Sequence, residues 1–163
     1  MKRRELENAL LILETTPFVY EKVVLGGDGA LRRKIADLLW EAVAIEEHVW
    51  SARVRLLQGE AAAVLPRLDR GIARRIAAGK TGAREAVAAF LKLRRENARV
   101  LRGIRSADAK LGGTVEGGGW FSLEDLPAAM AHEDQIFLRE LARRITVPAA
   151  AETRDPAPLL AAC

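Results

Sequence analysis

Apolar residues recur at helical spacing over four long stretches of the chain. In the clearest stretch, between residues 31 and 58, one stripe is formed by Ile35, Leu38, Leu39, Ala42, Ile45, Val49, Ala52 and Leu56. Positions three and four residues apart lie on the same face of an α-helix, so the stripe predicts an amphipathic helix with one buried side. Similar patterns predict helices over residues 5–25, 83–104 and 123–145.

Glycine and proline residues separate these stretches. Three glycines between residues 26 and 29 end the first stretch, and Gly59 ends the second. The segment 60–82 is less regular, with a break at Pro66 and a short helix expected over 69–78. Thr16-Pro17 predicts the start of a new helical segment within the first stretch. Ser122 is the expected N-cap of the last helix, after the glycine-rich connection LGGTVEGGG.

The composition favours an all-α protein. Apolar residues make up 50% of the 163 positions, but aromatic residues only 5%. Strong helix formers dominate and runs of β-branched residues are scarce. We therefore expect a single four-helix bundle over residues 1–147. The proline-containing segment 148–163 is expected to be a disordered tail.

The charge and the single cysteine limit the classes of partner and compartment. The net charge is +4, and much of the excess comes from arginines between residues 53 and 105, where Phe90 is the one aromatic residue. A basic stripe without interleaved aromatic residues is typical of a solvated helix face, so no specific nucleic-acid partner is expected. Cys163 cannot form a disulfide within the chain, which fits a cytoplasmic protein. No apolar run suits a membrane span, and no signal-peptide cleavage region follows the first residues, so no membrane partner is expected.

Four segments resemble the DinB-like superfamily in the same order along the chain. They are TTPFVYEKVVLG, EEHVWSARVRLLQGE, FLKLRRENARVLRGI and GGGWFSLEDLPAAMAHEDQIFLREL, and the resemblance covers roughly residues 10–145. It implies a four-helix bundle, often homodimeric, which frequently holds a divalent metal ion with three histidines. Relatives of this kind include thiol-dependent isomerases and transferases.

The three metal-ligand positions of that family carry over one at a time. Glu47, Trp50 and Arg53 match the frame that follows the first histidine, which places Ala42 at that ligand position. The other two ligands form a histidine pair in the last helix, and here His132 and Ile136 stand at those two positions. The resemblance thus implies a degenerate metal site in which one ligand of three remains, because methyl and sec-butyl side chains have no lone pair to donate.

Several residues near these positions are candidates for lining a pocket, namely Glu46, Trp50, Arg53, His132 and Ile136. Glu46 lies one turn from Ala42 and could ligate a metal ion with His132, whereas His48 faces elsewhere. The alternatives remain open: Glu46 and Glu133 can be ion-paired carboxylates, and His132 a buried, hydrogen-bonded imidazole.

Two further groups of side chains allow more than one interpretation. Arg53 can bind an acidic substrate or pair with Glu47 or Glu96. The three tryptophans, Trp40, Trp50 and Trp120, are interpreted as core or interface anchors.

Two functions remain for the chain. The first is a DinB-like protein with a degenerate metal site that serves as a small-molecule-binding or regulatory bundle, with no cofactor expected. The alternative is a metal- or thiol-dependent transferase or isomerase that uses a site rebuilt around His132. In that case zinc or nickel would be the metal. Whether the protein is an enzyme is left open.

Overall fold

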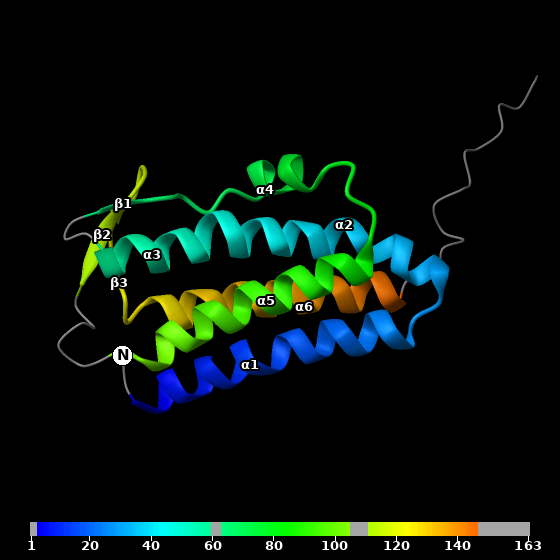
Figure 1. The fold of residues 1–163 in the computed structure, drawn as a ribbon, viewed down its shortest axis with the longest axis horizontal. Helices are drawn as coiled ribbons and strands as arrows, with labels where there is room; N and C mark the ends of the chain where they lie inside the picture. The colour runs from blue at the N-terminus through cyan, green and yellow to red at the C-terminus, as the bar shows by residue number, and fades with distance from the viewer. Residues whose placement is uncertain (1–2, 60–62, 105–110, 147–163) are drawn as a thin grey trace, which may run out of the picture.

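The computed structural model describes residues 3–59, 63–104 and 111–146, and the predicted four-helix bundle is confirmed. Four long rods lie side by side in Figure 1: α1 (Arg3–Gly26), the continuous rod α2 (Gly29–Ile45), η1 (Glu46–Trp50) and α3 (Ser51–Gly59), α5 (Ala83–Arg102) and α6 (Leu126–Thr146). The observed ends lie within a few residues of the predicted ones. The tail 148–163, with Cys163, lies outside the described residues.

Helix α1 runs through Pro17 without a break, so the prediction that Thr16-Pro17 starts a new segment is wrong. Pro17 has no N–H to donate to the preceding turn. The hydroxyl groups of the two threonines before it donate to carbonyls of the preceding turn, that of Thr16 to the Ile12 oxygen at 3.0 Å. The packing of buried residues on both sides of the proline, such as Leu13 and Tyr20, holds the helix continuous.

The second rod begins at a side-chain cap and contains a wider turn in its middle. The Asp28 carboxylate accepts a hydrogen bond of 2.7 Å from the Leu31 N–H, which caps α2. The segment η1 is a π-helical turn, which the sequence pattern did not predict. Insertions of this type occur mostly as single turns inside α-helices and are frequent at functional sites.

A short helix, α4 (Arg70–Ala77), lies across α2 on the outside of the bundle (Figure 1). Its N-cap is Asp69, whose carboxylate accepts a hydrogen bond of 2.9 Å from the Ile72 N–H. Ala73 and Ala77 are the buried residues of this helix. Ile76 is partly buried and packs against the core beside them, so α4 has an apolar side that faces the bundle.

A small sheet at one end of the bundle is the main departure from the all-α expectation. It consists of β1 (Ala63–Leu65), β2 (Gly112–Val115) and β3 (Trp120–Ser122), with β1 parallel and β3 antiparallel to the central β2. The glycines of β2 permit this close pairing. A Cβ atom on Gly113 would lie 2.2 Å from the Ala63 carbonyl oxygen.

The start of α6 also differs from the expectation, because Ser122 is the last residue of β3 and not an N-cap. Its N–H donates to the Asp125 carboxylate at 2.9 Å, and α6 begins at Leu126. The Asp125 side chain therefore stabilises the turn between sheet and helix.

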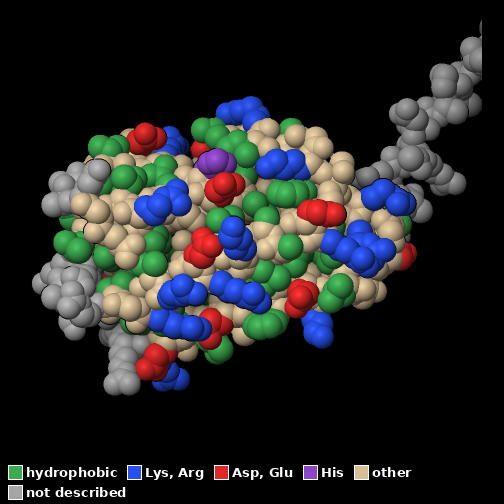
Figure 2. Space-filling view, viewed as in Figure 1, with side chains coloured by type: hydrophobic (Ala, Val, Ile, Leu, Met, Phe, Trp, Pro, Cys, Tyr) green, Lys and Arg blue, Asp and Glu red, His purple; other side chains and the backbone are tan. Residues whose placement is uncertain are grey.

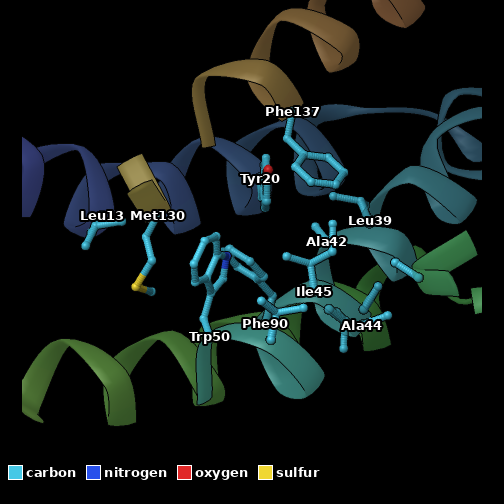
Figure 3. Packing of buried hydrophobic residues seen from close by; sticks show 14 of the residues in the cluster. Leu13, Tyr20, Leu39, Ala42, Ala44, Ile45, Trp50, Phe90, Met130 and Phe137 are labelled. Atoms are coloured by element: carbon cyan, nitrogen blue, oxygen red, sulfur yellow. The ribbon is translucent and has the colours of Figure 1, made fainter. Parts of the chain in front are cut away.

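The core lies between the four rods (Figure 3). The rings of Tyr20 and Phe90 have centroids 5.1 Å apart, and Trp50 is buried beside them, as predicted for a core anchor. Trp120 is mostly exposed, so its interpretation as a core residue is wrong. No helix within the described residues has the length and apolar content that crossing a bilayer requires.

We predict that Gly113→Ala separates β1 from β2 and lowers the free energy of unfolding by about 1–3 kcal/mol, the usual cost of overpacking. The matched control is Gly119→Ala, where a Cβ atom meets nothing within 4 Å. Urea unfolding followed by circular dichroism measures both, and we expect the control to stay within about 0.5 kcal/mol of the parent. Equal effects of the two substitutions would contradict the close approach of the strands.

Candidate functional site

The structure places the three positions implied as metal ligands in different surroundings, with His132 and Ile136 one turn apart on α6. Ala42 is buried in the core, where Figure 3 shows it near Leu39 and Ile45. Ile136 is half-buried on α6 and lines a surface groove. His132 is exposed, so the alternative of a buried imidazole is wrong. His48 is also exposed, 3.8 Å from the Glu47 carboxylate, and faces away from the core as predicted.

These positions do not fit a metal ion. Within residues 3–59, 63–104 and 111–146, no group of three or more His, Cys, Asp or Glu side chains is arranged to hold one. A transition-metal site needs about three protein ligands. A methyl group in the core, an exposed imidazole and an aliphatic side chain cannot supply them.

Glu46 forms part of a buried ion triad with Arg94 and Asp134. The Arg94 guanidinium donates to both Glu46 carboxylate oxygens, at 3.0 and 2.8 Å, and to both Asp134 oxygens, at 2.6 and 2.9 Å. Planar fork geometry of this kind is the strongest form of arginine–carboxylate pairing. The ion-paired interpretation of Glu46 is confirmed.

Burial and the opposed charges set the protonation of the triad. Burial raises the pKa of Glu46, and the neighbouring Arg94 only partly counteracts this effect. Burial alone would lower the pKa of Arg94, but the carboxylates of Glu46 and Asp134 reverse that effect and raise it. The guanidinium is therefore a permanent positive charge inside the bundle.

Polar side chains from three elements surround the triad. The Asn97 amide donates to Glu46 Oε1 at 2.7 Å and to Ser51 Oγ at 3.0 Å. The Tyr20 hydroxyl is buried and has no hydrogen-bond partner among the described residues. Burial, and next the charge of Asp134, raise the pKa of Tyr20, so the hydroxyl stays neutral.

Trp50 and Arg53 belong to the sheet end of the molecule rather than to a pocket. The Arg53 guanidinium donates to the Pro66 carbonyl oxygen at 3.0 and 2.8 Å and lies over the rings of Trp50 and Phe121, with its Cζ atom 5.1 and 4.8 Å from their centroids. The expected pairing of Arg53 with Glu47 or Glu96 is therefore wrong. Arg53 fixes the chain that follows β1.

A surface groove of about 630 Å³ lies between α2, α4 with its following turn, and α6. Its cationic lining side chains are Arg70, Arg74, Lys80, Arg139, Arg143 and Arg144. Its lining carboxylates are Asp37, Glu41 and Glu140. The volume lies within the range of small-molecule sites.

Arg70 connects α4 to carboxylates of α6 and α2 at this groove. Its guanidinium donates to Glu133 Oε1 at 2.9 and 2.7 Å, and its Nη1 lies 3.8 Å from Glu41 Oε1. Arg74 donates to Glu41 Oε2 at 3.0 Å, and the Arg70 guanidinium also lies over the Phe137 ring. The ion-paired interpretation of Glu133 is confirmed, and these ion pairs add to the apolar packing of Ala73, Ile76 and Ala77.

The sequence reasoning missed Arg94, Asp134 and Arg70. The spacing of Asp134 and Arg94 relative to apolar residues of their helices indicated that these two side chains are buried. Asp134 lies between Met130 and Phe137 in the buried stripe of α6, at separations of four and three residues. Arg94 follows the buried Phe90 by four residues. A charged residue within an apolar stripe indicates a buried ion pair, because an unpaired buried charge is too costly.

Charges of both signs are interspersed on the face of the molecule that Figure 2 shows. Exposed arginines of α5 lie among acidic side chains there, and Arg102 pairs with Glu14 of α1. This mixed surface agrees with the expectation of a solvated helix face for the exposed arginines, but the expectation is wrong for Arg53 and Arg94, which are buried.

Comparison with known proteins gives a likeness in structure but none in sequence. No family model and no curated protein matches the sequence. Among solved structures, the chain is similar to YfiT from Bacillus subtilis, with a TM-score of 0.68 over 89% of this chain and 90% of that chain. The two chains share a fold. YfiT is described as "a probable metal-dependent hydrolase with an unusual four-helix bundle topology", but at 14% identity the likeness shows the fold alone.

We predict that Arg94→Met lowers the free energy of unfolding by about 3–5 kcal/mol at pH 8, because it leaves buried carboxylates without their partner. The deficit should shrink at pH 5. Without Arg94, the already raised pKa of Glu46 rises further, and a raised carboxyl pKa gives stability below the unfolded value that is lost as pH rises through the folded value.

The control is Arg102→Met, which removes the exposed pair with Glu14 and should cost less than about 1 kcal/mol at either pH. Urea unfolding at the two pH values measures both variants. A deficit for Arg94→Met that is the same at pH 5 and pH 8 would show that lost packing, not charge, explains it.

Proposed function

We propose that this chain is a ligand-binding bundle of the DinB-like fold that works without a metal ion. The groove between α2, α4 and α6 receives a small molecule, and the metal site implied by the resemblance is degenerate. The chain acts by binding, as a regulatory or carrier protein of the cytoplasm. The alternative is a metal- or thiol-dependent enzyme with a site rebuilt around His132.

One observation carries the proposal: guanidinium groups already pair with the buried carboxylates of η1 and α6. Arg70 binds Glu133 at the groove, and Arg94 binds Glu46 and Asp134 in the core. A guanidinium supplies a fixed positive charge but no open coordination position. Carboxylates held in this way are not free to ligate an ion with the exposed His132.

The proposal includes a homodimer formed through α1. Leu11, Phe18 and Leu25 are 61%, 58% and 59% exposed and recur every seven residues along its outer face. An apolar repeat of seven residues packs against a helix with the same repeat, and a second copy of this chain supplies one. An exposed stripe of this kind favours an interface over a free surface.

We expect the purified protein to contain far less than one zinc or nickel ion per chain. Added metal should leave its melting temperature unchanged, because a ligand stabilises the native state only if it binds that state. Elemental analysis and thermal unfolding measure these quantities. Full metal occupancy that His132→Ala abolishes and the control His48→Ala preserves would instead favour the rebuilt enzyme site.

We also expect the chain, of 17.8 kDa, to sediment as a dimer at micromolar concentration. Phe18→Glu should give a monomer, because it places a charge in the centre of the apolar stripe. The matched control is Ile72→Glu, which changes a comparably exposed apolar residue on α4 and should leave the dimer intact. A wild-type protein that sediments as a monomer would refute this part of the proposal.

A further inference from the structure

The groove between α2, α4 and α6 contains more positive than negative charge. Four carboxylates lie in or beneath it: Asp37, Glu41, Glu133 and Glu140. Each pairs with one or two of four arginines, namely Arg70, Arg74, Arg143 and Arg144. These four positive and four negative charges cancel within the groove.

Glu140 stays ionised over the physiological pH range. Hydrogen bonds from Arg143, and to a smaller extent from Arg144, lower the pKa of Glu140 to about 2. Glu140 therefore remains negative and offsets one of the two positive charges of Arg143 and Arg144, while Asp37, which pairs with Arg144, offsets the other. The charge that Glu140 contributes to this side of the groove does not depend on pH near neutrality.

Lys80 and Arg139 are the cations left over. Within the described part of the chain, neither forms an ion pair with a carboxylate. The Lys80 ammonium lies 4.7 Å from the centroid of the Trp40 ring, and Arg139 Nε donates to the Gln135 carbonyl oxygen at 3.2 Å. Both side chains are exposed and both line the groove. The groove thus presents two positive charges without counter-charges.

We propose that the ligand of the groove is a dianionic small molecule, which carries either a phosphate monoester or two carboxylates and is bound by Lys80 and Arg139. This inference rests on the proposed ligand-binding function and names its ligand class. Two unmatched cations are complementary in charge to one dianion, and charge-assisted hydrogen bonds to arginine and lysine are the strongest polar contacts available to such a ligand.

The shape of the groove indicates a molecule larger than the anionic group itself. A volume of about 630 Å³ far exceeds the space that a phosphate group needs, and apolar lining comes from Leu38, Ala77, Ala78 and Ile136. Ile136 stands at a position where the resemblance implied a metal-binding histidine. In this proposal it provides apolar surface for the uncharged part of the bound molecule. The anionic end is placed by the charges around it.

The experiment measures binding of four probes to the full chain by calorimetry at constant ionic strength. Glycerol 3-phosphate and succinate are dianions of the two candidate kinds, lactate is a monoanion and glycerol is neutral. We expect at least one dianion to bind about tenfold more tightly than lactate, and glycerol not to bind. The dianion that binds more tightly shows whether the groove prefers a phosphate monoester or a dicarboxylate.

Substitutions in the groove test the role of each cation. Lys80→Gln and Arg139→Gln should each weaken binding of the preferred dianion about tenfold, the loss expected for one charge-assisted hydrogen bond. The matched control is Arg55→Gln, which removes an exposed positive charge on α3 outside the groove and should leave the affinity unchanged. Equal losses of affinity in all three variants would show that only the net charge of the protein matters, and this result would overturn the inference.

The remaining outcomes separate this inference from the proposed function. If lactate or glycerol binds as tightly as the dianions and shifts backbone amide resonances of groove residues, the ligand-binding function stands and the dianion inference fails. Failure of all four probes to bind also overturns the inference. If binding requires a stoichiometric metal ion that His132→Ala removes, the proposed metal-independent function itself fails.

Discussion

The double fork between Arg94 and the two carboxylates of Glu46 and Asp134 fixes how three of the four rods meet. One guanidinium from α5 makes four hydrogen bonds, two to η1 and two to α6. A buried ion group tolerates little displacement, because losing any partner leaves a desolvated charge. A shift of one helix by a single turn would break it, so the triad selects one register among many that apolar packing alone would accept.

A second group of arginine–carboxylate ion pairs links helices at the surface of the bundle. Arg70 reaches from α4 to Glu133 on α6 and lies near Glu41 on α2, and so bridges two of the rods. In both places a guanidinium provides the positive charge that carboxylates between helices require. Arginine keeps its charge at any pH the protein meets, so this arrangement is stable but chemically inert.

Helix α4 forms one side of the groove, together with α2 and α6. Ion pairs with Glu41 and Glu133 and the packing of Ile76 hold it against the bundle. The groove is consequently lined by both charged and aliphatic side chains. A site with this lining suits a molecule with an anionic end and a less polar body. The likeness to YfiT concerns the scaffold; the lining is a property of this chain.

Sequence periodicity alone determined the four rods and their approximate ends, because burial of an amphipathic stripe and local caps such as Asp28 act over a few residues. It also determined that His48 faces outward. Only the tertiary structure decided the partners of Glu46 and Glu133, the exposure of His132 and the sheet around Gly113. The ion pairs and the β1–β2 pairing depend on contacts between segments separated by 40 residues or more, such as Asp134 and Arg94. Spacing along a single helix specifies a face, but which side chain from another helix meets that face is fixed only when the rods pack.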